Sequence, residues 1–219
     1  MISAREALER LREGNRRFVS EDWSTQTLPS TTRRRELATG QAPFAIILGC
    51  SDSRVPAEIV FDQGLGDLFV IRVAGNIVAP SQIGSVEFAA ERFGTRLVVV
   101  LGHSMCGAIQ ATLEELERPS TGRSPHLRSI VDRVRPAVEE LLDTPLRKDP
   151  HALMHHAVRA NIRAAAAHLR HGSEMIENLI QRDGLVVVGA EYSLQTGIVD
   201  FFDDWPAWEG GAHTEFSGS

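Results

Sequence analysis

Four short apolar runs constrain the fold of this 219-residue chain more than any other feature of its sequence. Segments with helical periodicity separate these runs from one another. Strands that are apolar along their length are buried on both faces, and helices between them supply the crossovers that a parallel sheet needs. The pattern therefore predicts an α/β fold with a central, mostly parallel sheet flanked by helices. The four runs are Phe44–Leu48, Leu68–Val73, Leu97–Leu101 and Leu185–Gly189.

The helical segments lie between and around these strands. Pro136 should kink or split one of them, because proline lacks the backbone N–H that continues a helix. Gly172 is expected to break another. The segments with helical patterns are the stretch after Ser3, Ser85–Arg92, Cys106–Leu116, Leu127–Leu142 and Ala152–Gln181.

The first 40 or so residues are expected to form a helical arm. Ala4, Ala7, Leu8 and Leu11 recur with helical spacing, and Ser3 is placed as an N-cap. Such an arm has little core of its own, so we expect it to lie across another surface, which a partner subunit could provide. One domain over residues 1–203 is predicted, with a mobile tail at 204–219.

Charge and hydropathy limit the partners of this protein. Its net charge of −6 argues against nucleic acid, because phosphate binding calls for a basic face. The Arg33–Arg35 run is expected to lie in an exposed loop or helix. No apolar run approaches the roughly 20 residues of a membrane span, and no secretory signal is visible. A reduced, cytoplasmic setting is therefore predicted, with no membrane partner.

Two clusters near strand ends carry the candidate chemistry. Cys50 follows the first apolar run, and His103 and Cys106 follow the third; these are the two cysteines of the chain. Two thiols and one imidazole form a three-ligand zinc site with one position left open, where a water becomes a nucleophile. The helix that starts after His103 can supply N–H groups to the sulfurs. A purely structural zinc, or two buried free cysteines, is the alternative.

Asp52 and Arg54 are the informative neighbours of the first cysteine. Two residues apart in an extended turn, they can form a bidentate pair that keeps the carboxylate ionised and oriented. Beside a zinc-bound water, Asp52 can accept a hydrogen bond from that water and direct its remaining lone pair. With the salt bridge broken, the carboxylate could instead rotate onto zinc as a fourth ligand.

These residues resemble the β-class carbonic anhydrases. The matching motifs are Cys50-Ser-Asp-Ser-Arg54, His103-Ser-Met-Cys106-Gly, the segment Asp67–Asn76 and the segment Val188–Gly197. The resemblance implies a four-stranded parallel sheet with an added edge strand near Ile198 to Phe201. It implies one zinc ion per subunit on Cys50, His103 and Cys106, beside the Asp52–Arg54 pair. It also implies homodimers, often paired into tetramers, with the N-terminal helix packed on the partner, and the reversible hydration of CO₂ to bicarbonate.

The family divides over its pocket. One subgroup holds an always-open zinc, and the other carries a tryptophan three positions before the first cysteine, in a regulatory bicarbonate site. Here Ile47 takes that position, while Arg72 and Tyr192 align with the other parts of the site. Gln41 matches a glutamine that donates a hydrogen bond to substrate in the open subgroup. The resemblance therefore favours the open form.

Three further residues are expected to contact substrate. Phe69 matches an apolar position of the pocket, and Phe88 replaces a tyrosine that some open-subgroup members contribute from the dimer interface. Gly107 follows Cys106 in the second motif and is also expected to contact substrate. No residue can be assigned as the proton shuttle.

Two rival functions fit the same motifs. A hydrolase of carbon disulfide or carbonyl sulfide could keep the same zinc ligands on this scaffold. A zinc-binding regulatory module without turnover is the other, although it has no need of Asp52, Arg54 and Gln41. The histidines at 151, 155, 156, 168 and 171 are expected on solvated helix faces.

Overall fold

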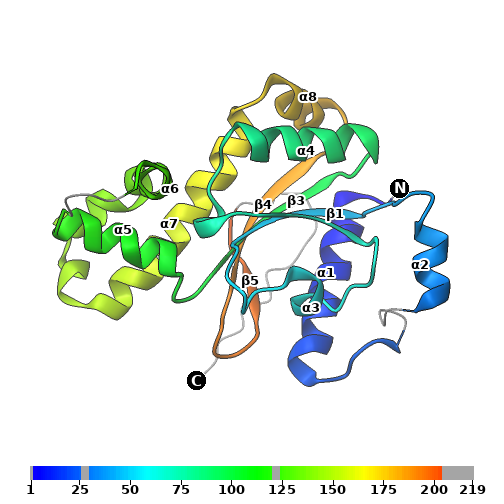
Figure 1. The fold of residues 1–219 in the computed structure, drawn as a ribbon, viewed down its shortest axis with the longest axis horizontal. Helices are drawn as coiled ribbons and strands as arrows, with labels where there is room; N and C mark the ends of the chain where they lie inside the picture. Colours follow the sequence, from blue (N-terminus) through cyan, green and yellow to red (C-terminus); the bar gives the residue numbers. More distant parts are fainter. Residues whose placement is uncertain (1, 26–29, 120–123, 204–219) are drawn as a thin grey trace, which may run out of the picture.

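The computed structural model describes residues 2–25, 30–119 and 124–203, which form an α/β fold around one five-stranded sheet (Figure 1). The strand order is β2-β1-β3-β4-β5, and the first four strands are parallel while β5 runs antiparallel to β4. This confirms the predicted fold class. The strands are β1 Ala45–Gly49, β2 Leu68–Arg72, β3 Leu97–His103, β4 Val186–Tyr192 and β5 Val199–Phe201.

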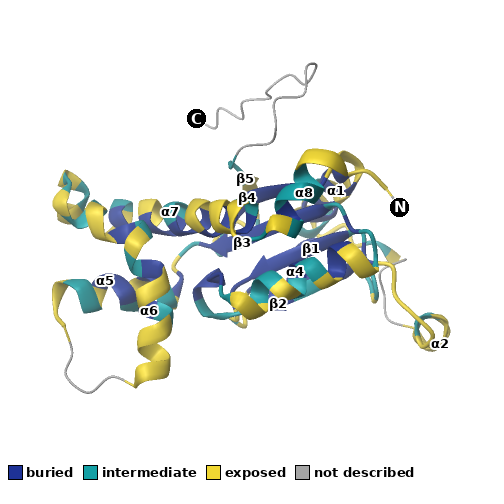
Figure 2. Ribbon diagram, turned by 90° about the horizontal axis from the view of Figure 1, so that it is seen from above, coloured by how far each residue is buried: buried dark blue, intermediate teal, exposed yellow. Residues whose placement is uncertain are grey.

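Helices cover both faces of the sheet, which is why its strands are apolar on both sides (Figure 2). Successive residues of β3 point to opposite cores: Val98 and Val100 face α4, α7 and α8, whereas Val99 faces α1 and α3. The α-helices are α1 Ala4–Ser20, α2 Thr31–Leu37, α3 Ala57–Val60, α4 Pro80–Arg92, α5 Gly107–Glu117, α6 Pro125–Val138, α7 Pro150–His171 and α8 Glu174–Arg182.

The first helix has more of its own core than the sequence suggested. Ser3 is its N-cap, as predicted, and it forms a capping box with Glu6. Its buried face packs against β1, β3 and α3 of the same chain. Asn15 donates to the carbonyl oxygens of Val60 and Gly197 and accepts from the N–H of Val199. The helix therefore lies on its own sheet, and contact with a partner subunit stays a prediction.

Two helix breaks were predicted from the sequence. Pro136 lies inside α6, which continues to Val138 before it tightens into a 3₁₀ turn at Glu139–Asp143, so the helix is not split at the proline itself. Gly172 separates α7 from α8, as predicted. Arg34 and Arg35 are exposed on α2, which buries none of its residues. The five histidines expected on helix faces are exposed on α7. The described helices include none that is both long and apolar enough to span a membrane. The predicted tail at 204–219 lies outside the described residues.

Candidate metal centre

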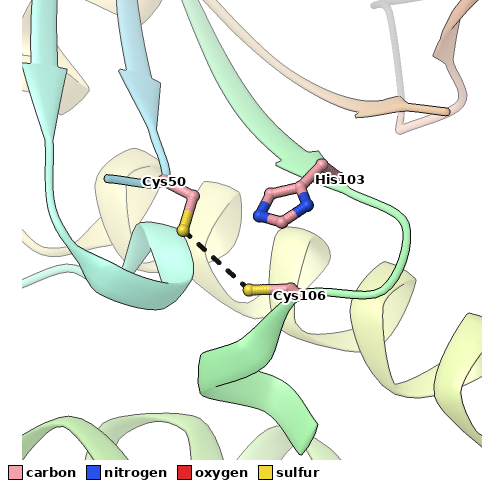
Figure 3. A group of neighbouring side chains, drawn as sticks. All are labelled: Cys50, His103 and Cys106. Atoms are coloured by element: carbon pink, nitrogen blue, oxygen red, sulfur yellow. Dashed lines mark hydrogen bonds between the residues drawn. The ribbon is translucent and has the colours of Figure 1, made fainter. Parts of the chain in front are cut away.

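Strand topology brings the three expected ligands together (Figure 3). Cys50 directly follows β1, His103 is the last residue of β3, and Cys106 is the N-cap of α5. Because β1 and β3 are parallel neighbours, their carboxyl ends meet at the same edge of the sheet. Met105, with φ of 54°, turns the chain so that Cys106 comes back toward His103.

The ligand atoms fit a tetrahedral zinc ion. The Sγ atoms of Cys50 and Cys106 and a ring nitrogen of His103 all lie within 4.8 Å of one another, and all three residues are buried. The two sulfurs are 3.9 Å apart. Two sulfurs at about 2.3 Å from one tetrahedral zinc would lie about 3.8 Å apart.

The histidine ring is oriented for metal binding. Nδ1 of His103 lies 2.9 Å from the carbonyl oxygen of Ser104, so Nδ1 carries the proton and donates it there. That tautomer leaves a lone pair on Nε2. Nε2 is one of two buried side-chain polar atoms that lack a hydrogen-bond partner within the described residues. A fully buried ring nitrogen without a partner is what a zinc ligand requires.

Backbone N–H groups point at both sulfurs. The N–H of Gly75 donates to Sγ of Cys50 over 3.4 Å. The pKa of Cys106 is raised overall, chiefly by its contact with Cys50 and by burial. The N–H groups of Ile109 and Ala108, in the first turn of α5, act in the opposite direction and lower it. The hydrogen bond from Cys106 is in turn the main cause of the lowered pKa of Cys50. Hydrogen bonds from the start of α5 were expected from the sequence, and the one from Gly75 was not.

Asp52 and Arg54 form the bidentate pair that their spacing suggested. Nε and Nη2 of Arg54 donate to the two carboxylate oxygens over 2.9 and 2.7 Å, and the backbone N–H of Arg54 donates over 3.0 Å. These hydrogen bonds hold the pKa of Asp52 well below its usual range. Oδ2 of Asp52 lies 3.7 Å from Nε2 of His103, so an ionised carboxylate borders the ligand group.

Arg72 supports the loop that follows β1. From the end of β2, its Nε donates to the carbonyl oxygen of Cys50 over 3.0 Å, and its Nη2 donates to that of Asp52 over 2.5 Å. Tyr192 ends β4, and two strands, β1 and β3, lie between β4 and the β2 strand that carries Arg72. Ile47 is fully buried on the face that α1 covers. The sequence comparison had grouped these three residues as remnants of a regulatory site.

Three of the expected substrate residues do not lie at the ligand group of this chain. Gln41 is exposed and precedes β1, so the length of that strand, roughly 16 Å, separates it from Cys50. Phe69 lies beside Ile46 near the start of β2, and its ring contacts that of Phe88, with centroids 6.2 Å apart. Gly107, by contrast, is exposed in the first turn of α5, next to Cys106.

Sequence reasoning missed one buried residue behind the centre. Asn161 of α7 is 3% exposed and donates from Nδ2 to the carbonyl oxygen of Gly75 over 2.8 Å. A signal existed, because Asn161 takes a core position of a helix whose neighbouring buried positions are apolar. A buried amide at such a position is retained for the hydrogen bonds it makes.

The fold and the ligand set define a class: an α/β metalloprotein in which two cysteines and one histidine leave one zinc position open. Residues 45–199 match the family model described as carbonic anhydrase. The chain belongs to the β-class carbonic anhydrases. It is 39% identical over 191 residues to "Carbonic anhydrase 2" of Mycobacterium tuberculosis, covering 87% of this chain and 89% of that protein.

Solved structures share the fold. The β-carbonic anhydrase CcaA superposes with a TM-score of 0.72 at 27% identity, over 91% of this chain and 93% of that one. Two β-carbonic anhydrases of Sordaria macrospora are described as tetrameric, and one matches with a TM-score of 0.66 at 28% identity, over 77% of this chain and 84% of its own. The zinc ion expected from the sequence is the cofactor of this family, and Cys50, His103 and Cys106 are placed to bind it.

Proposed function

We propose that this protein catalyses the reversible hydration of CO₂ to bicarbonate and a proton, with an active site that stays open to substrate. The observation that carries the proposal is the three-ligand centre, bordered by the ionised Asp52 carboxylate 3.7 Å from His103. Three protein ligands with an open position are typical of catalytic zinc, whereas structural zinc has four. Zinc in such a site supplies a water that loses its proton near neutral pH.

Asp52 has the position and charge to orient the nucleophile. Arg54 holds the carboxylate with three hydrogen bonds and keeps it ionised. An ionised carboxylate accepts a hydrogen bond from the attacking oxygen, which directs a lone pair of that oxygen at the carbon of CO₂. Arg54 thus acts through Asp52.

Two observations support the open form. Asp52 would have to give up its three hydrogen bonds with Arg54 before it could bind the metal as a fourth ligand. In addition, Arg72 already donates to the loop carbonyls, and Ile47 leaves no aromatic wall for a regulatory anion. In this structure, therefore, the carboxylate and the arginine that a closed arrangement would need are both engaged in other hydrogen bonds.

A second copy of the chain would complete the pocket. Gln41 and Phe88 are exposed and lie away from the ligand group of their own chain, and Phe88 is 53% exposed. We therefore assign Gln41 to the site of a partner subunit, where its amide donates to the substrate oxygen that gains charge in the transition state. Phe69 and Phe88 would form the apolar wall of that same site, while Gly107 lines the pocket of its own chain.

The assembly is therefore proposed to be a homodimer, and a tetramer is compatible with it because the Sordaria macrospora relatives are described as tetrameric. Thiolate ligands suit a reducing compartment, which supports a cytoplasmic location. The net charge of −6 supports a small-molecule substrate and no nucleic-acid partner.

Stopped-flow CO₂ hydration by zinc-replete protein, from about pH 6.5 to about pH 9, tests this function. A gradual rise in kcat/KM with one apparent pKa is the expected result, because the nucleophile is the deprotonated form of one water. Abrupt loss of activity below about pH 8 would overturn the open form, since it would place Asp52 on the metal. Absence of CO₂ hydration at every pH would overturn the function, and assays with carbonyl sulfide and carbon disulfide would then separate a related hydrolase from a protein without turnover.

A further inference from the structure

The hydrogen bond between the Gly75 N–H and the sulfur of Cys50 depends on an unusual turn. Gly75 lies in the 3₁₀ turn Ala74–Asn76 with φ of 71°, a left-handed conformation that side chains disfavour. A Cβ on Gly75 would also lie 3.2 Å from the Cβ of Ala108, in the first turn of α5. The turn therefore lies between Cys50 and the helix that carries the other cysteine, and both its φ and this short distance favour glycine.

Asn161 holds this turn from the other side. Its Nδ2 donates to the carbonyl oxygen of Gly75 over 2.8 Å, from a side chain that is 3% exposed. The N–H and C=O of Gly75 belong to two peptide planes that φ and ψ of this residue relate. With the backbone held at φ of 71° and ψ of 16°, a hydrogen bond that anchors the carbonyl also restricts the direction of the N–H. Ala157, Val158, Ile162 and Ala165 surround Asn161 on the buried face of α7, which supplies no other polar group there.

We propose that Asn161 is a positioning residue of the metal centre: through Gly75 it aims a backbone N–H at the thiolate of Cys50. A hydrogen bond to a metal-bound thiolate withdraws electron density from the sulfur and fixes the rotamer of the ligand. The inference rests on the zinc site and not on the reaction. Its failure can therefore be distinguished from a failure of the proposed CO₂ hydration.

Cadmium-113 NMR tests the hydrogen bond directly in the parent protein. With ¹¹³Cd in place of zinc, an N–H···S–Cd hydrogen bond transmits scalar coupling from the metal to the amide proton. The expected result is coupling between ¹¹³Cd and the Gly75 amide. A folded, cadmium-loaded protein in which the Gly75 amide shows no coupling would overturn the proposal.

The role of Asn161 is tested by Asn161→Leu beside the matched control Asn15→Leu. Asn15 is also a buried asparagine that binds backbone groups, but it lies on the opposite face of the sheet, in α1. Both variants should melt at lower temperature than the parent. Only Asn161→Leu should bind zinc about 10–100-fold more weakly in competition with a chelator, which is the usual effect of losing such a partner.

The Co²⁺-substituted proteins give the signature that a merely structural role would not produce. The sulfur-to-cobalt charge-transfer band of Asn161→Leu should move to lower energy, because its thiolate is more electron-rich, while the band of Asn15→Leu should match the parent. Equal zinc affinity and an unmoved band in Asn161→Leu, or the same changes in both variants, would overturn the proposal. If Asn161→Leu does not fold, Asn161→Ser with the same measurements and the ¹¹³Cd coupling decide the question.

Discussion

The two ends of the sheet differ in how much of a site one chain builds. At the carboxyl ends of β1 and β3, Cys50, His103 and Cys106 are buried within 4.8 Å of one another, and Asp52 borders them. Toward the opposite end, Gln41 is exposed and the Phe69–Phe88 pair opens to the surface. The metal centre is thus complete within a chain, whereas the proposed pocket is divided between surfaces that two chains would bring together.

This difference has a physical origin. Metal ligands must be fixed to within fractions of an ångström, and the ends of neighbouring parallel strands provide that precision. Residues that touch a small apolar substrate tolerate more movement and can be brought by a partner. The predictions below test each end of the sheet and the division between them, from the largest expected effect to the smallest.

Replacing a ligand should have the largest effect, and it acts on the metal end alone. Cys50→Ser should lose zinc and turnover almost completely, since a hydroxyl is a much poorer zinc ligand than a thiolate. Metal content per subunit measures this after purification. Ser53→Ala is the control, because Ser53 is exposed in the same loop and lies outside the ligand group. A Cys50→Ser protein with one zinc per subunit would contradict the ligand assignment.

Asp52→Asn should separate metal binding from turnover. The variant should keep its zinc and lose about 10²–10³-fold in kcat, because a neutral amide has one acceptor oxygen instead of two and holds the proton of the nucleophile more weakly than a carboxylate does. The pH profile and metal content are measured on the same preparation. Parent-like kcat in Asp52→Asn would remove the orienting role from this carboxylate.

Gln41→Ala should cost about 2–3 kcal/mol of barrier, by comparison with other donors to a developing oxyanion. Zinc content should not change, because Gln41 lies at the other end of β1 from Cys50. Unchanged kcat/KM would exclude Gln41 from the mechanism.

Co-expression of Gln41→Ala with Cys50→Ser tests whether the pocket is shared. In a mixed dimer, the subunit that lacks Gln41 keeps its metal, and its partner supplies the glutamine. Random pairing gives about a quarter of the subunits a complete site, so activity should exceed that of either variant alone. Activity no higher than that expected from separate subunits would mean that Gln41 does not act across an interface.

Phe88→Tyr should have the smallest effect. The side chain is 53% exposed on α4, so a hydroxyl group can be added without strain. Because the apolar face of the ring is retained, kcat/KM should stay within about threefold of the parent and thermal stability should not change. The two steady-state constants and a melting curve check this. A loss of kcat/KM comparable to that of Gln41→Ala would mean that Phe88 is packed in an interface that has no room for a hydroxyl group and excludes water.

Local patterns predicted the parts of the structure that depend on neighbouring residues. The strands and the metal ligands could be predicted because strands that are apolar along their length indicate a parallel sheet. The carboxyl ends of its strands, which carry the ligands, lie at the same end of that sheet. The distance between Gln41 and Cys50 could not be predicted from their nine-residue separation in the sequence. In the structure Gln41 precedes β1 and Cys50 follows it, so the strand keeps the two residues apart. Asn161 was missed because its partner, Gly75, is 86 residues away. The burial of α1 was underestimated because the surface it covers comes from β1, β3 and α3.

The strand order also bears on how the protein matures during synthesis. β3 is buried along its whole length, and its second edge pairs with β4, which is made only after α5 to α8 and the turns between them. The N–H of Ser104, between two of the metal ligands, donates to the carbonyl oxygen of Tyr192 at the end of β4. A nascent chain therefore carries an unpaired apolar edge until Tyr192 has left the ribosome, and such edges recruit other chains. The loop between His103 and Cys106 can therefore form its hydrogen bond to Tyr192 only after β4 has been made.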